Sequence, residues 1–230
     1  MNYFLYNFVI MNQEVSKILD IVCEKYPEID TIVIFGSANH LGWNPESDID
    51  LFFIDDSLSD GRIDLEINNI RIEIQTDSFA GVENCLKNEY GRLLNRNVSN
   101  MIATSQTVRC KSSERFEGLK AAAESTLASK TTFDDEDAKM WRYSIEDYLD
   151  KAAKDLKRGD SVAFYFDTHY VIQNATELVL AKSGNYFPQP KNLAGILEKI
   201  APSFLACLRE FMTENDLNRK LEILKKTKNF

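Results

Sequence analysis

Histidine, cysteine and long hydrophobic runs are scarce in this sequence. Only two histidines occur, His40 and His169, and the four cysteines are scattered. Because zinc sites need clustered Cys and His ligands, a structural zinc site is not expected. No apolar run reaches the roughly 20 residues of a membrane-spanning helix, and residues 1–11 lack the basic segment of a signal peptide. Free thiols fit a reducing cytoplasm, where we expect the protein to act without membrane contact.

Positive charge is scarce as well. The chain has 27 Lys and Arg residues against 36 Asp and Glu residues, which gives a formal net charge of -9. Proteins that bind nucleic-acid polymers normally carry a basic surface, so such a polymer is not an expected partner. An acidic protein attracts small cationic molecules instead.

The patterns of apolar residues divide the chain into two parts. Strand-like and helical patterns alternate up to about residue 130, and beyond it every clear pattern is helical. Strands and helices segregated in this way are typical of two domains. We therefore predict an α+β fold with one mixed domain at residues 1–130 and one helical domain at residues 131–230.

The predicted elements follow from periodicity and from turn residues. In the first part we expect strands at residues 31–35, 49–54 and 107–110 and helices at residues 12–26, 79–87, 91–104 and 114–129. In the second part we expect helices at residues 137–158, 161–183, 193–200, 203–213 and 214–226.

Residues 62–75 alternate between apolar and polar side chains, as two paired strands do. Asn68 and Asn69 interrupt the alternation, and asparagine tolerates the positive φ of a two-residue hairpin turn. The pattern therefore predicts a β-hairpin in which Ile67 lies opposite Ile70.

This register has an electrostatic consequence. Glu66 would face Arg71, which is a favourable cross-strand pair. Asp64 would face Glu73, and like charges directly opposite each other are destabilising. A cation near Glu73 would relieve the repulsion, and so would a shift of the register by one residue.

The most informative segment begins with the apolar run Ile32–Phe35, which ends in Gly36 and Ser37. Ten residues further on, Asp48 and Asp50 introduce a second apolar run. Side chains two residues apart on a strand lie on one face, roughly 6.6 Å apart. Two such acids repel each other, whereas a divalent cation would bind them both. Mg²⁺ with a phosphate-bearing substrate is the expected ligand.

Gly36-Ser37, the ten-residue spacing and Asp48-Ile49-Asp50 with its hydrophobic continuation resemble the signature of the nucleotidyltransferase superfamily. That superfamily includes DNA polymerase beta, kanamycin nucleotidyltransferase and the minimal nucleotidyltransferases. The resemblance implies a short mixed sheet with helices on one side. It also implies Mg²⁺-dependent transfer of a nucleoside monophosphate, with pyrophosphate as the leaving group.

The resemblance also implies roles for individual residues. Asp48 and Asp50 would bind metal ions, and Gly36-Ser37 would hold the triphosphate. A third carboxylate completes such sites. Glu73 matches its position best and would bind metal or act as general base, with Asp64 as the alternative.

One departure concerns positive charge. Many family members carry a basic residue just after the Gly-Ser pair, but residues 38–43 offer only His40, which we take as neutral. The missing charge would then come from elsewhere, either from the second domain or from one of four arginines, Arg62, Arg71, Arg92 and Arg96.

The second part resembles the C-terminal helical domain of antibiotic nucleotidyltransferases. Lys191, in a loop at residues 184–191, is a candidate nucleotide-binding residue, with a solvated lysine as the alternative. Several aromatic residues recur at helical spacing, and we expect most of them in the core: Trp141, Tyr148, Tyr165, Phe166, His169 and Tyr170. The acids among them either form a solvated face or line a cleft for a polyamine-like acceptor: Glu146, Asp147, Asp150 and Asp167.

Together these patterns predict an Mg²⁺-dependent, adenylyltransferase-like enzyme. It would transfer AMP from ATP, or a related group from another nucleoside triphosphate, to a hydroxyl of a small and cationic molecule such as an antibiotic. The alternatives are a nucleotide-binding or antitoxin-like partner module without turnover, and AMP transfer to a protein. The resemblance leaves a homodimer open. His169 has no arginine four to six residues before it, so the related ribonuclease toxins are not expected.

Overall fold

The computed structural model describes residues 12–39, 43–44, 46–93 and 95–230. The predictions that concern residues 1–11 and His40 lie outside these ranges. The chain divides into two compact units. The N-terminal unit comprises the described residues up to Tyr90 together with Arg96–Ser129, and the helical unit comprises Gly91–Asn95 together with Lys130–Phe230.

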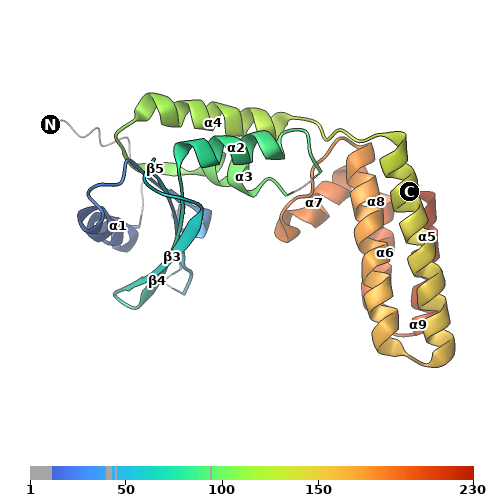
Figure 1. Cartoon of the computed structure of the whole chain (residues 1–230). Helices are drawn as coiled ribbons and strands as arrows, with labels where there is room; N and C mark the ends of the chain where they lie inside the picture. Colours follow the sequence, from blue (N-terminus) through green and yellow to red (C-terminus); the bar gives the residue numbers. More distant parts are fainter. Residues whose placement is uncertain (1–11, 40–42, 45, 94) are drawn as a thin grey trace. The chain divides into compact units, whose positions relative to one another are not determined.

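The N-terminal unit is built around a five-stranded mixed sheet with the strand order β3-β4-β2-β1-β5 (Figure 1). The strands are β1 (Thr31–Phe35), β2 (Ile49–Ile54), β3 (Gly61–Ile67), β4 (Ile70–Asp77) and β5 (Gln106–Cys110). Strands β2 and β4 run parallel, and the other neighbours run antiparallel. The predicted strands at residues 31–35 and 49–54 are confirmed at both ends.

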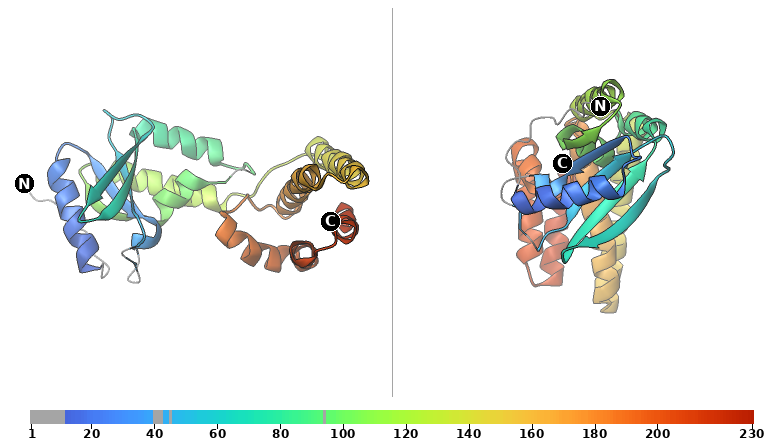
Figure 2. Two further views of the ribbon diagram at one scale, coloured as in Figure 1. Left: turned by 90° about the horizontal axis from the view of Figure 1, so that it is seen from below. Right: turned by 90° about the vertical axis from the view of Figure 1, so that its left-hand side faces the viewer.

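Helices cover both faces of this sheet (Figure 2). Helix α1 (Gln13–Lys25) packs on the face that carries Ile32 and Ile34. The opposite face, with Val33 and Phe52, is covered by α2 (Phe79–Glu89), α3 (Asn97–Thr104) and α4 (Ser113–Ala128). The expectation of helices on one side was wrong, because the central strands are apolar on both faces and both need burial.

The hairpin has the predicted register. Ile67 pairs with Ile70, and the antiparallel ladder places Asp64 opposite Glu73. Asn68 and Asn69 have φ values of 54° and 62°. A two-residue loop with positive φ at both positions is a type I′ turn, whose twist matches that of the strands it joins.

The helical unit contains five α-helices and a short 3-10 helix among the residues that the structure describes. They are α5 (Asp135–Arg158), α6 (Ser161–Lys182), α7 (Pro190–Ile200), α8 (Pro202–Thr213), α9 (Leu217–Lys225) and η2 (Lys226–Asn229). A capping box between Asp134 and Asp137 begins α5, and Gly159, at φ 73°, ends it. Helices α5 and α6 lie side by side as an antiparallel pair (Figure 1).

Several aromatic residues expected in the core of the helical unit are exposed. Tyr148 and Trp141 do pack against the core, but Phe166, Tyr165 and Tyr170 are 63%, 47% and 42% exposed. The buried stripe of α6 instead follows Phe164, Thr168, Val171 and Ala175. Periodicity alone did not identify which of two overlapping stripes on α6 would face its neighbours.

The helix predicted at residues 91–104 begins only at Asn97. Gly91 has a φ of 69°, which is not helical. The backbone here forms hydrogen bonds within the helical unit, since Thr132 N donates to Gly91 O and Phe187 N donates to Leu93 O, both at 2.9 Å. Tertiary hydrogen bonds therefore replace the first turns of the predicted helix.

No helix in the described part of the chain is both long and apolar enough to cross a membrane.

Candidate active site

Three predicted acids form a row across neighbouring strands of the N-terminal unit. Asp50 on β2 pairs with Glu73 on β4, and Glu73 pairs with Asp64 on β3. Asp48 directly precedes β2 and lies two residues before Asp50. We call these four carboxylates the acid row. Of the two candidates for the third carboxylate, Glu73 is the one beside Asp50, and Asp64 lies one strand further out.

Gly36 brings the predicted phosphate-binding turn against the acid row. It begins the 3-10 helix η1 (Gly36–Asn39) directly after β1 and has a φ of 70°. A β-carbon at this position would lie 2.2 Å from Oδ2 of Asp50. Only glycine fits so close to the carboxylate. Gly36 and Ser37 are both exposed, so this turn is open to a ligand.

The rest of η1 is anchored in the protein. Ala38 and Asn39 are buried. Asn39 Nδ2 donates to Thr104 O at 2.7 Å, at the end of α3, and Gln106 Nε2 donates to Asn39 O at 3.3 Å. These bonds fix the turn relative to β5 and α3 while leaving Gly36 and Ser37 at the surface.

Two arginines bind the carboxylate of Glu73. Arg62 approaches Glu73 Oε1 to 2.7 Å and Arg71 approaches the same atom to 2.8 Å. The Glu73 side chain is only 22% exposed, whereas those of Arg62 and Arg71 are 49% and 55% exposed. The two guanidinium groups thus supply the positive charge that relieves the repulsion between Asp64 and Glu73.

The same arginines reach the other acids. Arg62 donates to Asp64 Oδ1 at 2.9 Å, and this hydrogen bond lowers the pKa of the Asp64 carboxyl. Arg71 lies 3.7 Å from Asp64 and 3.9 Å from Oδ2 of Asp48. Arg71 therefore contacts carboxylates on both sides of the hairpin and at the entrance to β2.

The net charge of this cluster is one that a single divalent cation would neutralise. Four carboxylates face two guanidinium groups, which leaves a net charge of −2. Among the described residues, no three His, Cys, Asp or Glu side chains are arranged to hold a metal ion. Two carboxylates plus substrate phosphates are the usual ligands of Mg²⁺. Asp48 and Asp50 fit that donor set, and the Asp50 carboxylate lies directly against Gly36.

Arg96, another candidate for the missing cation, is a structural residue. Its side chain is fully buried. It donates to Thr126 O, and to Ser129 O and Oγ at 2.8 and 2.9 Å. These acceptors lie at the C-terminal end of α4, where carbonyl groups lack partners within the helix. A cation buried against carbonyls is not placed to meet a phosphate.

The remaining candidate cations belong to the helical unit. Arg92 lies in Gly91–Asn95 and is exposed. Lys191 is exposed as well, but it lies in the first turn of α7 rather than in the predicted loop. Nucleotide binding by Lys191 stays a prediction.

Two of the predicted acids of the helical unit are close to lysines. Asp147 pairs with Lys151 at 2.7 Å, and Glu146 lies 3.9 Å from Lys228. Burial raises the pKa of Asp167, and hydrogen bonding to Asp155 raises it further. A cleft for a cationic acceptor built from these acids stays a prediction.

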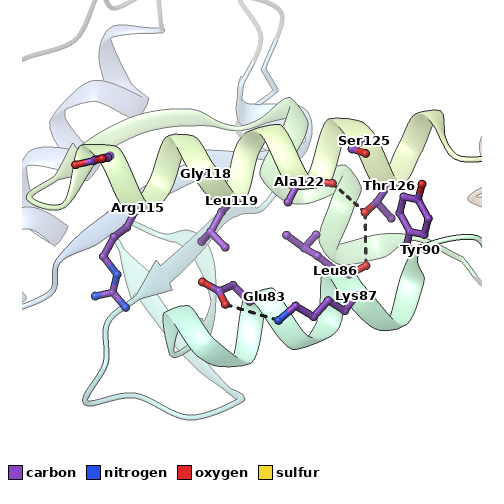
Figure 3. Close-up of a pocket in the computed structure, with 11 residues that line it drawn as sticks. Glu83, Leu86, Lys87, Tyr90, Arg115, Gly118, Leu119, Ala122, Ser125 and Thr126 are labelled. Atoms are coloured by element: carbon purple, nitrogen blue, oxygen red, sulfur yellow. Dashed lines mark hydrogen bonds and ion pairs between the residues drawn. The ribbon is translucent and has the colours of Figure 1, made fainter.

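A separate pocket lies between α2 and α4 (Figure 3). Leu86, Leu119 and Ala122 contribute apolar surface to its lining. Three of its charged lining residues have partners, because Lys87 lies 4.0 Å from Glu83 and Arg115 pairs with Asp56 at 2.8 Å. Asp56 follows the C-terminal end of β2, whereas Asp48 precedes its N-terminal end. The pocket therefore begins at the other end of β2 from the acid row.

Sequence reasoning identified the acids but not the way in which the arginines bind them. Arg71 and Glu73 lie two residues apart on one strand and therefore share a face, which the sequence alone indicates. Arg62 reaches Glu73 diagonally, from the position two residues before Asp64. The signal was the hairpin register, in which both arginines flank the opposed acids.

Residues 15–102 match the family model described as "Nucleotidyltransferase domain". The matched segment contains strands β1 to β4, the Gly36 turn and the acid row. The match covers less than half of the chain and does not extend to the helices beyond residue 130. No curated protein matches the sequence.

The fold is similar to that of a solved structure, a nucleotidyltransferase-like protein from Exiguobacterium sibiricum 255-15. The TM-score is 0.54 and the sequence identity 12%, over 94% of this chain and 73% of that chain. At this identity the likeness shows the fold alone. The matched domain supports nucleotidyl transfer as the class of reaction. The likeness in structure supports an α+β nucleotidyltransferase fold with a helical C-terminal region.

Proposed function

We propose that this protein transfers a nucleoside monophosphate, AMP from ATP, to a hydroxyl group of a small molecule. The observation that carries the proposal is the juxtaposition of Gly36, Asp50 and Glu73, which joins an exposed Gly-Ser turn to carboxylates on two parallel strands. The acceptor oxygen forms a bond to the α-phosphorus and loses its proton. The bond between the α-phosphorus and the bridging oxygen breaks, and pyrophosphate leaves.

The residues of this site have distinct proposed tasks. Gly36 and Ser37 present backbone N–H groups and a hydroxyl to the triphosphate. Asp48 and Asp50 hold Mg²⁺, which when bound stabilises negative charge on the reacting phosphate. The predicted role of Glu73 as a metal ligand or general base would require it to leave Arg62 and Arg71, to which it is bound here.

The acceptor proposed for this reaction is a cationic molecule such as an aminoglycoside. The support is the net charge of -9, because an acidic protein concentrates cations near its surface. The test is incubation with α-labelled ATP, Mg²⁺ and a panel of aminoglycosides, lincosamides and proteins. Labelled aminoglycoside is the expected product, and labelled protein would instead favour protein AMP transfer.

The catalytic variants are Asp48→Asn and Asp50→Asn, with Asp60→Asn as the matched control. Asp60 is an exposed acid of the same unit, in the loop between β2 and β3. We expect both catalytic variants to lose transfer and the control to keep it. Full transfer by the Asp48→Asn/Asp50→Asn double variant would contradict the mechanism.

One observation favours a second function, that of a nucleotide-binding module without turnover. The third carboxylate of the site has its charge balanced by two guanidinium groups. Calorimetry with ATP distinguishes the two functions, because a binding module takes up the nucleotide without releasing pyrophosphate.

A further inference from the structure

We propose that Arg62 and Arg71 bind the phosphates of the nucleotide, that Glu73 aligns these two arginines, and that Asp48 and Asp50 alone hold the divalent cation. This inference rests on the proposed function for the nature of the ligand, and it deepens the assignment of the same site. It places one metal ion, rather than two, in the acid row.

The position of Glu73 between two guanidinium groups is the first observation. Both arginines contact one carboxylate oxygen, at 2.7 and 2.8 Å. A metal ion bound to Glu73 would sit within contact distance of two positive charges, and like charges at such distances repel strongly. The geometry therefore makes Glu73 an anchor for arginine side chains. It leaves the metal to Asp48 and Asp50, since Arg71 is 3.9 Å from Asp48 but only 2.8 Å from Glu73.

The second observation is the exposure of the two arginines. About half of each side chain is open to solvent, although both are held by ion pairs. A guanidinium group carries five N–H donors in a planar fork that matches phosphate oxygens. Bonds to Glu73 and Asp64 use only part of this capacity, so Arg62 and Arg71 can bind phosphate without leaving their carboxylates.

The third observation is that no lysine or arginine follows Gly36-Ser37 closely in the sequence, and that the other arginines described in the N-terminal unit bind elsewhere. Residues 38–43 contain no lysine or arginine, so the Gly36 turn offers neutral donors only. Other arginines described in the N-terminal unit have structural partners. Arg96 binds carbonyls of α4, Arg109 binds Cys23 O and Tyr26 O, and Arg115 binds Asp56.

The charge balance makes phosphate binding conditional on metal. The acid row with its two arginines has a net charge of −2, which repels a polyphosphate. One divalent cation at Asp48 and Asp50 brings the cluster to neutrality. The phosphates then meet a cluster whose guanidinium groups are exposed, and we expect inorganic tripolyphosphate to bind only when Mg²⁺ is present.

The experiment is calorimetric titration of inorganic tripolyphosphate into the full-length protein at saturating Mg²⁺. We compare wild type with Arg62→Ala, Arg71→Ala and the double variant. Arg115→Ala is the matched control, since Arg115 is 50% exposed and ion-paired in the same unit. We expect the double variant to weaken binding by about tenfold or more, as loss of charge-assisted hydrogen bonds does, and the control to bind as wild type. Wild-type affinity in the double variant would overturn the proposal.

The metal sites are counted separately by electron paramagnetic resonance of Mn²⁺ with tripolyphosphate present. We expect one Mn²⁺ per chain in the wild type and in Glu73→Gln, and loss of that ion in Asp48→Asn and Asp50→Asn. Glu73→Gln keeps the size of the side chain but removes the charge that aligns the arginines, so it should weaken tripolyphosphate binding. Two ions per chain, or loss of the ion in Glu73→Gln, would overturn the assignment.

These measurements separate this inference from the proposed function. Arginine-dependent tripolyphosphate binding without transfer to any acceptor would support the phosphate site and contradict the proposed enzyme. The opposite result is also possible to recognise. If the wild type transfers label from α-labelled ATP but the double arginine variant binds tripolyphosphate normally, the proposed enzyme is supported and the arginine phosphate site is contradicted.

Discussion

The carboxylate of Asp50 occupies the space that a side chain at position 36 would need. A β-carbon built on Gly36 lies 2.2 Å from Oδ2 of Asp50, and the backbone there has a φ of 70°. The end of β1 and the start of β2 therefore approach each other closely at this point. The close approach of these two residues explains why position 36 needs glycine, and it also defines where Asp50, a candidate metal ligand, lies.

Gly36→Ala should destabilise the N-terminal unit and displace Asp50. We expect the free energy of unfolding to fall by about 1–3 kcal/mol, because alanine is strained at positive φ and its β-carbon overlaps the carboxylate. Urea denaturation measures the change. Gly118→Ala is the control, since Gly118 lies on α4 and a β-carbon there would meet no atom within 4 Å, and it should gain about 0.5–1 kcal/mol. An unchanged midpoint for Gly36→Ala would contradict this account.

The Asn68-Asn69 turn should accept glycine better than alanine. Both residues have positive φ, which costs an ordinary residue about 1–2 kcal/mol. We expect Asn69→Ala to lower the free energy of unfolding by about 1 kcal/mol and Asn69→Gly to leave it unchanged or raise it by a few tenths. Urea denaturation of the two variants side by side provides the comparison. Equal stability of both variants would show that this turn does not constrain the hairpin.

Arg96 should be essential for the stability of the N-terminal unit rather than for catalysis. Arg96→Met keeps much of the buried volume but removes the guanidinium group that donates to Thr126 O and Ser129 O. We expect a loss of about 2–4 kcal/mol in the free energy of unfolding. Arg115→Met, at an exposed ion pair, should cost less than about 1 kcal/mol. Similar losses in both variants would refute the structural role of Arg96.

Asp167 should make the helical unit less stable as the pH rises. Burial raises the pKa of Asp167, and its hydrogen bond to Asp155 raises it further. Oδ2 of Asp155 is buried and has no hydrogen-bond partner among the described residues. The contribution of Asp167 to the free energy of unfolding is complete below the pKa of an unfolded aspartate, about 3.9. It is lost as the pH rises through the raised pKa of Asp167 in the folded protein.

Asp167→Asn tests this direction. The amide keeps a donor at every pH, so the variant should be more stable than wild type at pH 7 and should vary less between pH 4 and pH 7. Urea denaturation at the two pH values measures it. Lys151, Asp147 and Arg158 also face this region, so Asp150→Asn, an exposed acid of α5, is the control and should follow the wild-type profile. A wild-type profile in Asp167→Asn would disprove the assignment.

Local features of the sequence were sufficient for the strands and the hairpin. Residues 31–35 and 49–54 are short apolar runs bounded by turn residues, and the structure begins and ends β1 and β2 at those positions. The register of the hairpin followed from alternation and from Asn68-Asn69, because a one-residue slip would turn every apolar side chain outward. These properties depend on neighbours along the chain.

Residues 91–96 show where local reasoning failed. Their pattern predicts helix, but the backbone at Gly91 and Leu93 bonds to Thr132 and Phe187, which lie far away in the sequence. The position of Arg96 could not be predicted either, because a charged residue is normally exposed and is buried only where tertiary acceptors satisfy it.

The sequence by itself determined the acids, the Gly-Ser turn and their spacing, because those depend on residue type and on strand periodicity. Only the tertiary structure decided which acids meet. The parallel pairing of β2 with β4 puts Glu73, rather than Asp64, beside Asp50, and the long-range order of strands is not encoded in either strand alone. The same sheet places Arg62 and Arg71 on Glu73, because cross-strand and diagonal neighbours exist only once the sheet has formed.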